Sequence, residues 1–157
     1  MNETITKAEP VEGVGGVKPL TRAGRVYFAG QPSAEAIRAL AENEKIEVLV
    51  SFRHPMEMVT VGLDTTSVCD SCGVRYVNIP FGKAFTSAEV DQLAEVLDST
   101  EGKIALHCGT SNRVGMIWAA YLATKQGVPV EEAIEVGRSA GMTMPELETF
   151  VRSFLSA

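Results

Sequence analysis

Hydrophobic and polar positions alternate along the chain with two periods, one typical of strands and one typical of helices. Short runs that are strongly apolar or alternating predict strands at 26–29, 46–52, 75–80 and 103–107. Apolar residues three and four apart predict helices at 34–43, within 54–73, after residue 86, at 112–126 and after residue 144. Strands that alternate with helices, without a tight hairpin signal, favour an α/β fold in which helices flank a parallel-dominated central sheet.

The predicted helices carry clear start signals, and one of them is expected in the core. Thr86 and Glu89 have the spacing of a capping box, and so do Thr143 and Glu146. The segment 112–126 is apolar over one broad side, which predicts a buried helix.

The composition fits one domain with a substantial core. The chain has 157 residues, of which 45% are apolar and 22% are charged. Residues 1–19 are rich in Gly, Glu and Pro and are expected to form a flexible N-terminal arm, which leaves 20–157 as a single domain. Within that domain, 54–73 is the least regular segment. Part of it is predicted helical, with an apolar face of Met56, Val59 and Leu63.

Charge and hydropathy exclude several classes of partner. The net charge is −6 and no basic cluster is present, so nucleic acid is not an expected partner. No apolar run approaches the roughly 18–20 residues that span a bilayer, so no membrane span is expected. The N-terminus lacks the hydrophobic core of a signal peptide, which fits a cytoplasmic protein and also an exported domain whose signal peptide was removed. The oligomeric state is left open.

The strongest chemical signal is the segment 103-KIALHCGTSNRVGMIWAAYLA-123, in which Cys108 follows a predicted strand and Arg113 opens a predicted helix. Ligands of open α/β sheets bind at the carboxyl ends of strands. The amides of residues 109–112 would form an anion-binding nest there, and Arg113 would grip two oxygens of a phosphate-like group. The same positive field would stabilise a thiolate at Cys108, which makes this residue a candidate nucleophile.

A simpler interpretation exists for each of these residues alone. A single cysteine at a strand end is more often a small buried hydrophobe, and it is the ordered strand, cysteine, loop, arginine and helix that favours a functional site. His107 would either orient the loop by hydrogen bonds or fill space in the core. The candidate catalytic residues are Cys108 and Arg113, and the candidate substrate-binding residues are His107, Gly109, Thr110, Ser111 and Asn112.

This segment resembles the loop and helix of the cysteine-dependent phosphatases. More narrowly, it resembles the bacterial beta-lactamase hydrolase-like (protein-tyrosine-phosphatase-like) family, whose loop typically reads Cys-x-Ser-Gly-Asn-Arg with four residues between Cys and Arg. The resemblance spans residues 24–156. Its other landmarks are Ala29-Gly30-Gln31-Pro32-Ser33, Val48-Leu49-Val50-Ser51-Phe52-Arg53 with Glu57, and Tyr76-Val77-Asn78-Ile79-Pro80.

The resemblance implies a cysteine-phosphatase-like fold and hydrolysis of phosphate monoesters such as phosphotyrosine or aryl phosphates. Cys108 would attack phosphorus to form a phosphocysteine, Arg113 and the loop amides would stabilise the equatorial oxygens, and water would hydrolyse the intermediate. The implied partner is a phosphorylated small molecule or a phosphoprotein. Neither a metal nor another cofactor is implied.

Three departures from the family pattern bear on activity. Ser111 stands where relatives carry glycine, so it would have to adopt backbone angles that favour glycine. Val114 lacks the hydroxyl that many phosphatases carry after the arginine. The loop 81–85 lacks the general-acid carboxylate, which leaves as candidates by default Glu57, Asp64, Asp70 and Glu89. We therefore expect weak activity on alkyl phosphates and better activity on aryl phosphates, whose leaving groups need less protonation.

Two other functions fit the same loop. A rhodanese-like sulfurtransferase would carry a persulfide on Cys108, and a pseudophosphatase would bind phosphate without turnover. Elsewhere, Cys69 and Cys72 form a C-x-x-C that fits a reduced pair or a reversible disulfide, while a zinc site lacks a second Cys/His pair. Arg53 follows a predicted strand end and would either pair with Glu57 or touch the substrate.

Overall fold

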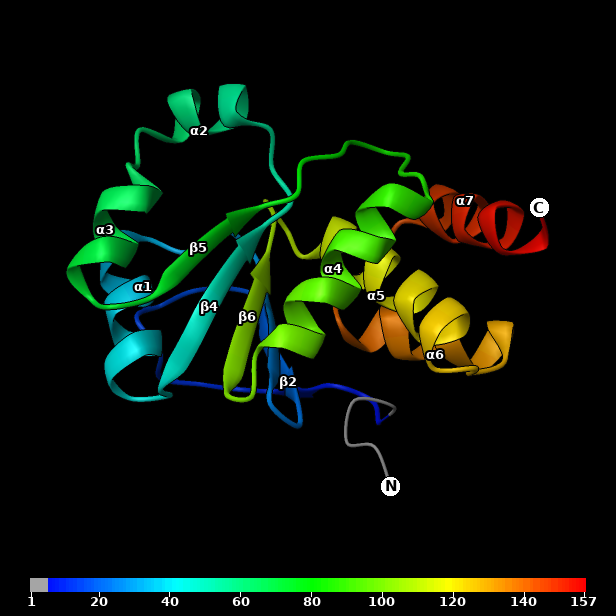
Figure 1. Cartoon of the computed structure of the whole chain (residues 1–157), viewed down its shortest axis with the longest axis horizontal. Coiled ribbons are helices and arrows are strands. Elements are labelled where there is room, and N and C mark those ends of the chain that lie inside the picture. The colour runs from blue at the N-terminus through cyan, green and yellow to red at the C-terminus, as the bar shows by residue number, and fades with distance from the viewer. Residues whose placement is uncertain (1–5) are drawn as a thin grey trace.

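A computed structural model describes residues 6–157 and shows a mixed sheet with helices on both faces (Figure 1). The strands within this range are β1 (Glu9–Pro10), β2 (Leu20–Ala23), β3 (Val26–Ala29), β4 (Ile46–Ser51), β5 (Arg75–Asn78) and β6 (Lys103–His107). The helices are α1 (Ala34–Glu42), α2 (Pro55–Val61), α3 (Thr65–Ser71), α4 (Ser87–Ser99), α5 (Asn112–Lys125), α6 (Val130–Ser139) and α7 (Pro145–Ser156).

The strand order is β1-β2-β3-β6-β4-β5, and β3, β6, β4 and β5 are parallel to one another. The parallel-dominated α/β fold predicted from the sequence is therefore confirmed. The expectation of no hairpin is wrong, because β2 and β3 pair antiparallel across the two residues Gly24 and Arg25. Gly24 has a φ of 59°, a left-handed angle that suits a two-residue hairpin turn.

The helices form two unequal layers. Helices α1 and α3 pack on one face of the sheet, whereas α4, α5, α6 and α7 cover the other face (Figure 1). Strand β4 contributes to both layers because Val48 and Val50 face the larger core and Leu49 faces the smaller one. Its continuous apolar run is thus explained by burial on both faces.

Helix α5 is the centre of the larger layer. Every residue from Val114 to Leu122 is buried, as the apolar pattern predicts. Helix α6, which follows Pro129 and is not anticipated by the sequence pattern, packs closely against it. A Cβ on Gly115 would lie 2.3 Å from the Gly137 carbonyl oxygen, so the two backbones approach at a distance that only glycine allows.

The N-terminal segment is packed on the domain in its described part. Residues 1–5 of the expected flexible arm 1–19 lie outside the described residues. Beyond them, β1 (Glu9–Pro10) pairs with β2, and Val14 is buried in the smaller core. The physical reason is that the valines of this Gly-rich stretch find apolar surface beside α1, a contact that composition alone does not reveal.

Helix α2 also differs from expectation. Part of the segment 54–73 is helical as predicted, but of the predicted apolar face only Leu63 packs on the smaller core, whereas Met56 is 77% and Val59 75% exposed. Helix α2 stands apart from both layers, above the carboxyl ends of the strands (Figure 1). No helix within residues 6–157 combines the length and the apolarity that crossing a bilayer requires.

Candidate active site

The segment from His107 to Arg113, here called the cysteine loop, leaves β6 at the edge where the parallel strands end. It is fixed to the neighbouring strand β3 and the turn after it. The Cys108 N–H donates to the Ala29 carbonyl at 3.3 Å, and the Gln31 N–H donates to the Gly109 carbonyl at 3.1 Å. The loop is therefore shaped by its neighbours as well as by its own sequence.

A cavity of about 380 Å³ opens in front of this loop. The thiol of Cys108 lines it, although that residue is only 1% exposed. The remaining lining residues are Glu57, Gly82, Lys83, Gly109, Thr110, Asn112, Arg113, Met144 and Leu147. The structure thus places the candidate nucleophile in the lining of a cavity that is open to a small ligand.

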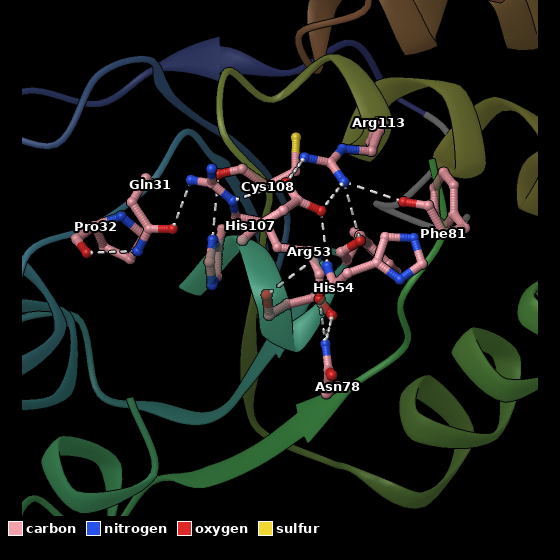
Figure 2. Close-up of polar contacts among 12 residues, drawn as sticks. Gln31, Pro32, Arg53, His54, Asn78, Phe81, His107, Cys108 and Arg113 are labelled. Carbon is pink, nitrogen blue, oxygen red and sulfur yellow. Dashed lines mark hydrogen bonds and ion pairs between the residues drawn. The ribbon is translucent and has the colours of Figure 1, made fainter. Parts of the chain in front are cut away.

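The Arg113 guanidinium is held at one end by a carboxylate and a backbone carbonyl. Its Nη1 donates to Glu57 Oε2 at 2.9 Å and to the Phe81 carbonyl at 3.0 Å. Its Nη2 donates to Glu57 Oε1 at 2.7 Å. Figure 2 shows this guanidinium beside the sulfur of Cys108, and that neighbour contributes to the raised pKa of Arg113 after the larger effect of the Glu57 hydrogen bond. The ordered arginine therefore reaches the nucleophile.

This arrangement leaves one edge of the guanidinium available. Arg113 has five N–H groups, and the bonds to Glu57 and Phe81 use two on Nη1 and one on Nη2. The remaining Nε–H and second Nη2–H lie next to each other along one edge of the planar guanidinium. Two parallel N–H groups at that spacing match two oxygens of a phosphate-like anion.

Glu57 connects two arginines. Besides Arg113, it accepts a hydrogen bond from Arg53 Nε at 3.2 Å, the local pair that the sequence suggests. The hydrogen bond from Arg113 is the largest cause that lowers the pKa of Glu57 to about 2, so this carboxylate is charged at neutral pH. Arg53 also donates from Nη1 to Gln31 Oε1 at 3.0 Å and packs behind Gly109, so the structure assigns it to the support of the loop.

Ser111 takes the backbone conformation that its place in the loop demands. Its φ is 69° and its ψ is 2°, in the left-handed region that favours glycine. The side chain is buried, and its hydroxyl donates to the Ala140 carbonyl at 2.7 Å. The hydroxyl therefore points into the protein interior, and any contact of Ser111 with a substrate would use its backbone N–H.

Asn112 supports the wall of the cavity. Its Oδ1 accepts from the N–H groups of Thr143 and Met144, at 2.7 and 3.1 Å, and its Nδ2 donates to Thr110 Oγ1 at 3.0 Å. The capping box predicted at Thr143 and Glu146 is wrong, because the N-cap of α7 is Met144 and has no side-chain cap bond, and Asn112 instead holds the two residues before the helix. This pairing across 31 residues has no local sequence signal.

The amides of the loop are consistent with an anion nest. Among the hydrogen bonds of residues 6–157, none uses the N–H of Gly109 or of Ser111. Buried backbone donors are normally paired, so these two groups are suited to an incoming acceptor. The N-terminus of α5 adds its own partial positive charge at the same point.

His107 lies behind the loop and is fully buried. Its Nδ1 lies 3.3 Å from the Cys108 carbonyl oxygen, while its Nε2 has no hydrogen-bond partner within residues 6–157. Burial, assisted by the charges of Arg53 and Arg113, lowers the pKa of His107 to about 4, so the imidazole is neutral at pH 7. Figure 2 shows the ring on the side of Cys108 away from the sulfur, where it can support the loop but not touch a ligand.

Two of the four carboxylates considered as general acids are engaged away from the cavity. Asp64 accepts from the Ser67 N–H as the N-cap of α3, and Glu89 accepts from the Thr86 N–H in a capping box. Glu57 is the only carboxylate that lines the cavity within the described residues, and it is ionised by its arginines. No group of three or more metal-ligating His, Cys, Asp or Glu side chains occurs between residues 6 and 157.

Comparison with known proteins identifies the fold. No protein-family model and no curated protein sequence matches the chain. Among solved structures, TpbA of P. aeruginosa is similar with a TM-score of 0.74 and 24% identity, over 94% of this chain and 89% of that one. A cysteine-to-serine variant of TpbA in complex with pTyr has a TM-score of 0.68 and 23% identity, over 93% and 88% of the two chains.

A third similar structure is that of PTPMT1 in complex with PI(5)P, with a TM-score of 0.67 and 21% identity over 83% of this chain and 90% of that one. Identities at this level establish a shared fold. The chain therefore has the fold seen in these solved structures.

Proposed function

We propose that this protein is a cysteine-dependent phosphatase that hydrolyses phosphate monoesters, with aryl phosphates such as phosphotyrosine as the favoured class. The observation that carries the proposal is Cys108 in the lining of a cavity, beside a guanidinium whose Nε–H makes no hydrogen bond within residues 6–157. The pTyr complex of TpbA supports this substrate class, since the two chains share the fold. We also infer membership of the beta-lactamase hydrolase-like family, from the four-residue spacing between Cys108 and Arg113.

The mechanism follows from the placement of these groups. The Cys108 thiolate attacks phosphorus, the bond to the ester oxygen breaks, and a phosphocysteine forms. The side edge of Arg113 and the free amides of Gly109 and Ser111 bind the equatorial oxygens as their charge rearranges. Water then attacks phosphorus, releases inorganic phosphate and regenerates the thiolate. Fixed donors of this kind act most strongly in a pocket that excludes water.

The cavity lacks a proton donor for the leaving oxygen among its described carboxylates, because Glu57 is ionised. Without a protonated carboxylate, the leaving group departs as an anion or takes its proton from solvent or from the Lys83 ammonium. Missing acid catalysis costs about 10²–10⁴ in rate for a poor leaving group and much less for an aryl oxide. We expect kcat/KM to fall steeply as the pKa of the leaving group rises, and equal rates for aryl and alkyl phosphates would contradict this mechanism.

The central test compares wild type with Cys108→Ser on an aryl phosphate. Wild type should release phosphate, and the serine variant should show no turnover while it still binds inorganic phosphate, because the loop and Arg113 are retained. Circular dichroism confirms that the variant is folded. Transfer of sulfur from thiosulfate to cyanide, without release of phosphate, would instead identify the rhodanese-like alternative.

A second candidate is a phosphate-binding protein without turnover. The observation that favours it is the absence of a protonated carboxylate from the described cavity lining. This candidate predicts that wild type binds phosphate with the same affinity as Cys108→Ser and hydrolyses no aryl phosphate, including those with the best leaving groups.

A further inference from the structure

The loop between β5 and α4 presents a cation to the cavity from a fixed base. Phe81 and Phe85 are buried at its two ends, with their rings 5.3 Å apart in an edge-to-face arrangement. Phe85 also packs on Phe150 of α7, with ring centroids 4.9 Å apart. Between these anchors, residues 82–84 are exposed. We call residues 81–85 the rim loop.

The rim loop is tied directly to the catalytic arginine. Arg113 donates to the Phe81 carbonyl at 3.0 Å, and Lys83 stands two residues further along the chain. Two residues span at most about 7 Å, so the Lys83 backbone is held close to the anion site. Lys83 lines the same cavity as Cys108, so its side chain can reach a ligand there.

Lys83 differs from the other cations of the site in having no carboxylate partner. Arg53 and Arg113 share Glu57, whereas none of the ion pairs within residues 6–157 includes Lys83. Glu57 is already satisfied by both arginines and is the only carboxylate in the described cavity lining. The ammonium group therefore remains available to an anion on the ligand.

Part of the cavity lining is apolar. Met144 and Leu147 line it at the start of α7, and Met144 is 36% exposed. Asn112 holds this part of the lining, because its Oδ1 accepts from the Met144 N–H. A ligand in the cavity can therefore contact both an apolar surface and Lys83.

We propose that Lys83 selects substrates that carry a second negative charge on the leaving group, next to an apolar body that packs on Met144 and Leu147. The inference rests on the proposed phosphatase function. The substrate class is then an aryl phosphate with an acidic substituent. The phosphate occupies the cysteine loop and the second anion pairs with the Lys83 ammonium.

The test uses 3-carboxyphenyl phosphate and its methyl ester, which differ in one negative charge. The quantity measured is the ratio of kcat/KM for the acid to that for the ester, compared between wild type and Lys83→Gln. The small difference in leaving group cancels in this comparison. We expect the ratio to be about 2–5-fold higher in wild type, the range of an exposed ion pair, and to shrink toward that of the variant in 1 M salt.

Lys125→Gln is the matched control. Lys125 is also an exposed lysine, but it lies at the far end of α5 and pairs with Asp91 at 2.6 Å. Its substitution should leave the ratio at the wild-type value. An unchanged ratio in Lys83→Gln would overturn the proposal. An equal loss of kcat/KM on both substrates would also overturn it, because Lys83 would then affect catalysis without binding the second anion.

Failure of the phosphatase function is distinguished by a binding measurement. If wild type hydrolyses neither compound, the dissociation constants of both compounds are measured by calorimetry for Cys108→Ser and for the double variant with Lys83→Gln. Preferential binding of the acid that depends on Lys83 would uphold the inference without turnover. Equal binding of the two compounds by both variants would overturn it.

Discussion

Two buried thiols of this chain lie in opposite environments. Cys69 in α3 and Cys108 after β6 are 0% and 1% exposed, and neither forms a disulfide. Cys69 packs in the smaller core, where burial, with the nearby Cys72 and Asp70, raises its pKa to about 12. Cys108 instead faces a cavity lined by Arg113. Equal burial thus accompanies very different chemistry.

The comparison shows that the surrounding dipoles and charges decide the role of a cysteine. Helix α3 offers Cys69 side-chain packing and no cation, which favours the neutral thiol. The cysteine loop instead surrounds Cys108 with backbone amides, the N-terminus of α5 and the Arg113 guanidinium, which together are suited to bind an anion. The C-x-x-C pair of α3 consists of free thiols here, in line with a reduced structural pair.

The largest expected contrast is in alkylation. At pH 7.5, the raised pKa lowers the thiolate fraction of Cys69 about 10³-fold relative to an unshifted thiol. Iodoacetamide should therefore label Cys108 before Cys69, and inorganic phosphate should slow the labelling of Cys108 by occupying the loop. Peptide mapping by mass spectrometry measures both. Rapid labelling of Cys69, or labelling of Cys108 at a rate that phosphate does not change, would contradict the proposed difference between the two thiols.

The second contrast is in catalysis. Arg113→Lys keeps the charge but cannot bind Glu57 end-on while offering a second edge to an oxyanion. We expect kcat/KM on an aryl phosphate to fall about 10²–10³-fold. Arg138→Lys, in an exposed pair with Glu148, is the control and should retain activity. A loss of kcat/KM of less than about threefold for Arg113→Lys would show that bidentate binding by the guanidinium is not used.

The third contrast concerns the backbone that shapes the loop. Gly141 has a φ of 122°, and a Cβ there would lie 2.5 Å from the Ser111 side chain. Gly141→Ala should destabilise the protein by about 2–4 kcal/mol, measured by urea unfolding, because it adds both overpacking and backbone strain. Gly82→Ala is the control, since a Cβ there meets nothing within 4 Å. Equal stabilities of the two variants would contradict the packing described.

The smallest contrast separates the hydroxyl of Ser111 from its backbone. Ser111→Ala keeps the positive φ but loses the bond to the buried Ala140 carbonyl, which should cost about 1–2 kcal/mol. Ser111→Gly loses the same bond but relieves the left-handed strain, so its stability should lie about 1 kcal/mol above that of the alanine variant. Thermal unfolding measures both, and the reverse order would show that φ is not the constraint.

The sequence predicts the features of this site that depend on neighbouring residues. The apolar run before Cys108 and the buried helix after Arg113 place both on one strand–loop–helix unit, as the structure has them. The need for a glycine-like conformation at Ser111 also follows from its place in the loop, and its φ of 69° confirms it. The local pair of Arg53 with Glu57 is confirmed as well.

Features that depend on distant residues could not be predicted in this way. Glu57 and Arg113 are 56 residues apart, and only the parallel arrangement of β4 and β6 brings α2 over the cysteine loop. The same holds for Asn112, which binds the N–H groups of Thr143 and Met144 just before α7, although the sequence suggests a capping box at Thr143. The apolar pattern of α2 does not predict its position, because the hydrogen bonds of Glu57 with Arg113 hold this helix and none of its residues is buried.

The hydrogen bonds that fix the Arg113 guanidinium through Nη1 and Nη2 affect the free energy of ligand binding. A free arginine side chain loses up to about 2 kcal/mol of rotamer entropy when it is immobilised. Here Glu57 and the Phe81 carbonyl impose that loss during folding, before any anion arrives. The protein therefore meets its ligand with a rigid receptor, and affinity for a small anion is not diminished by ordering the group that recognises it.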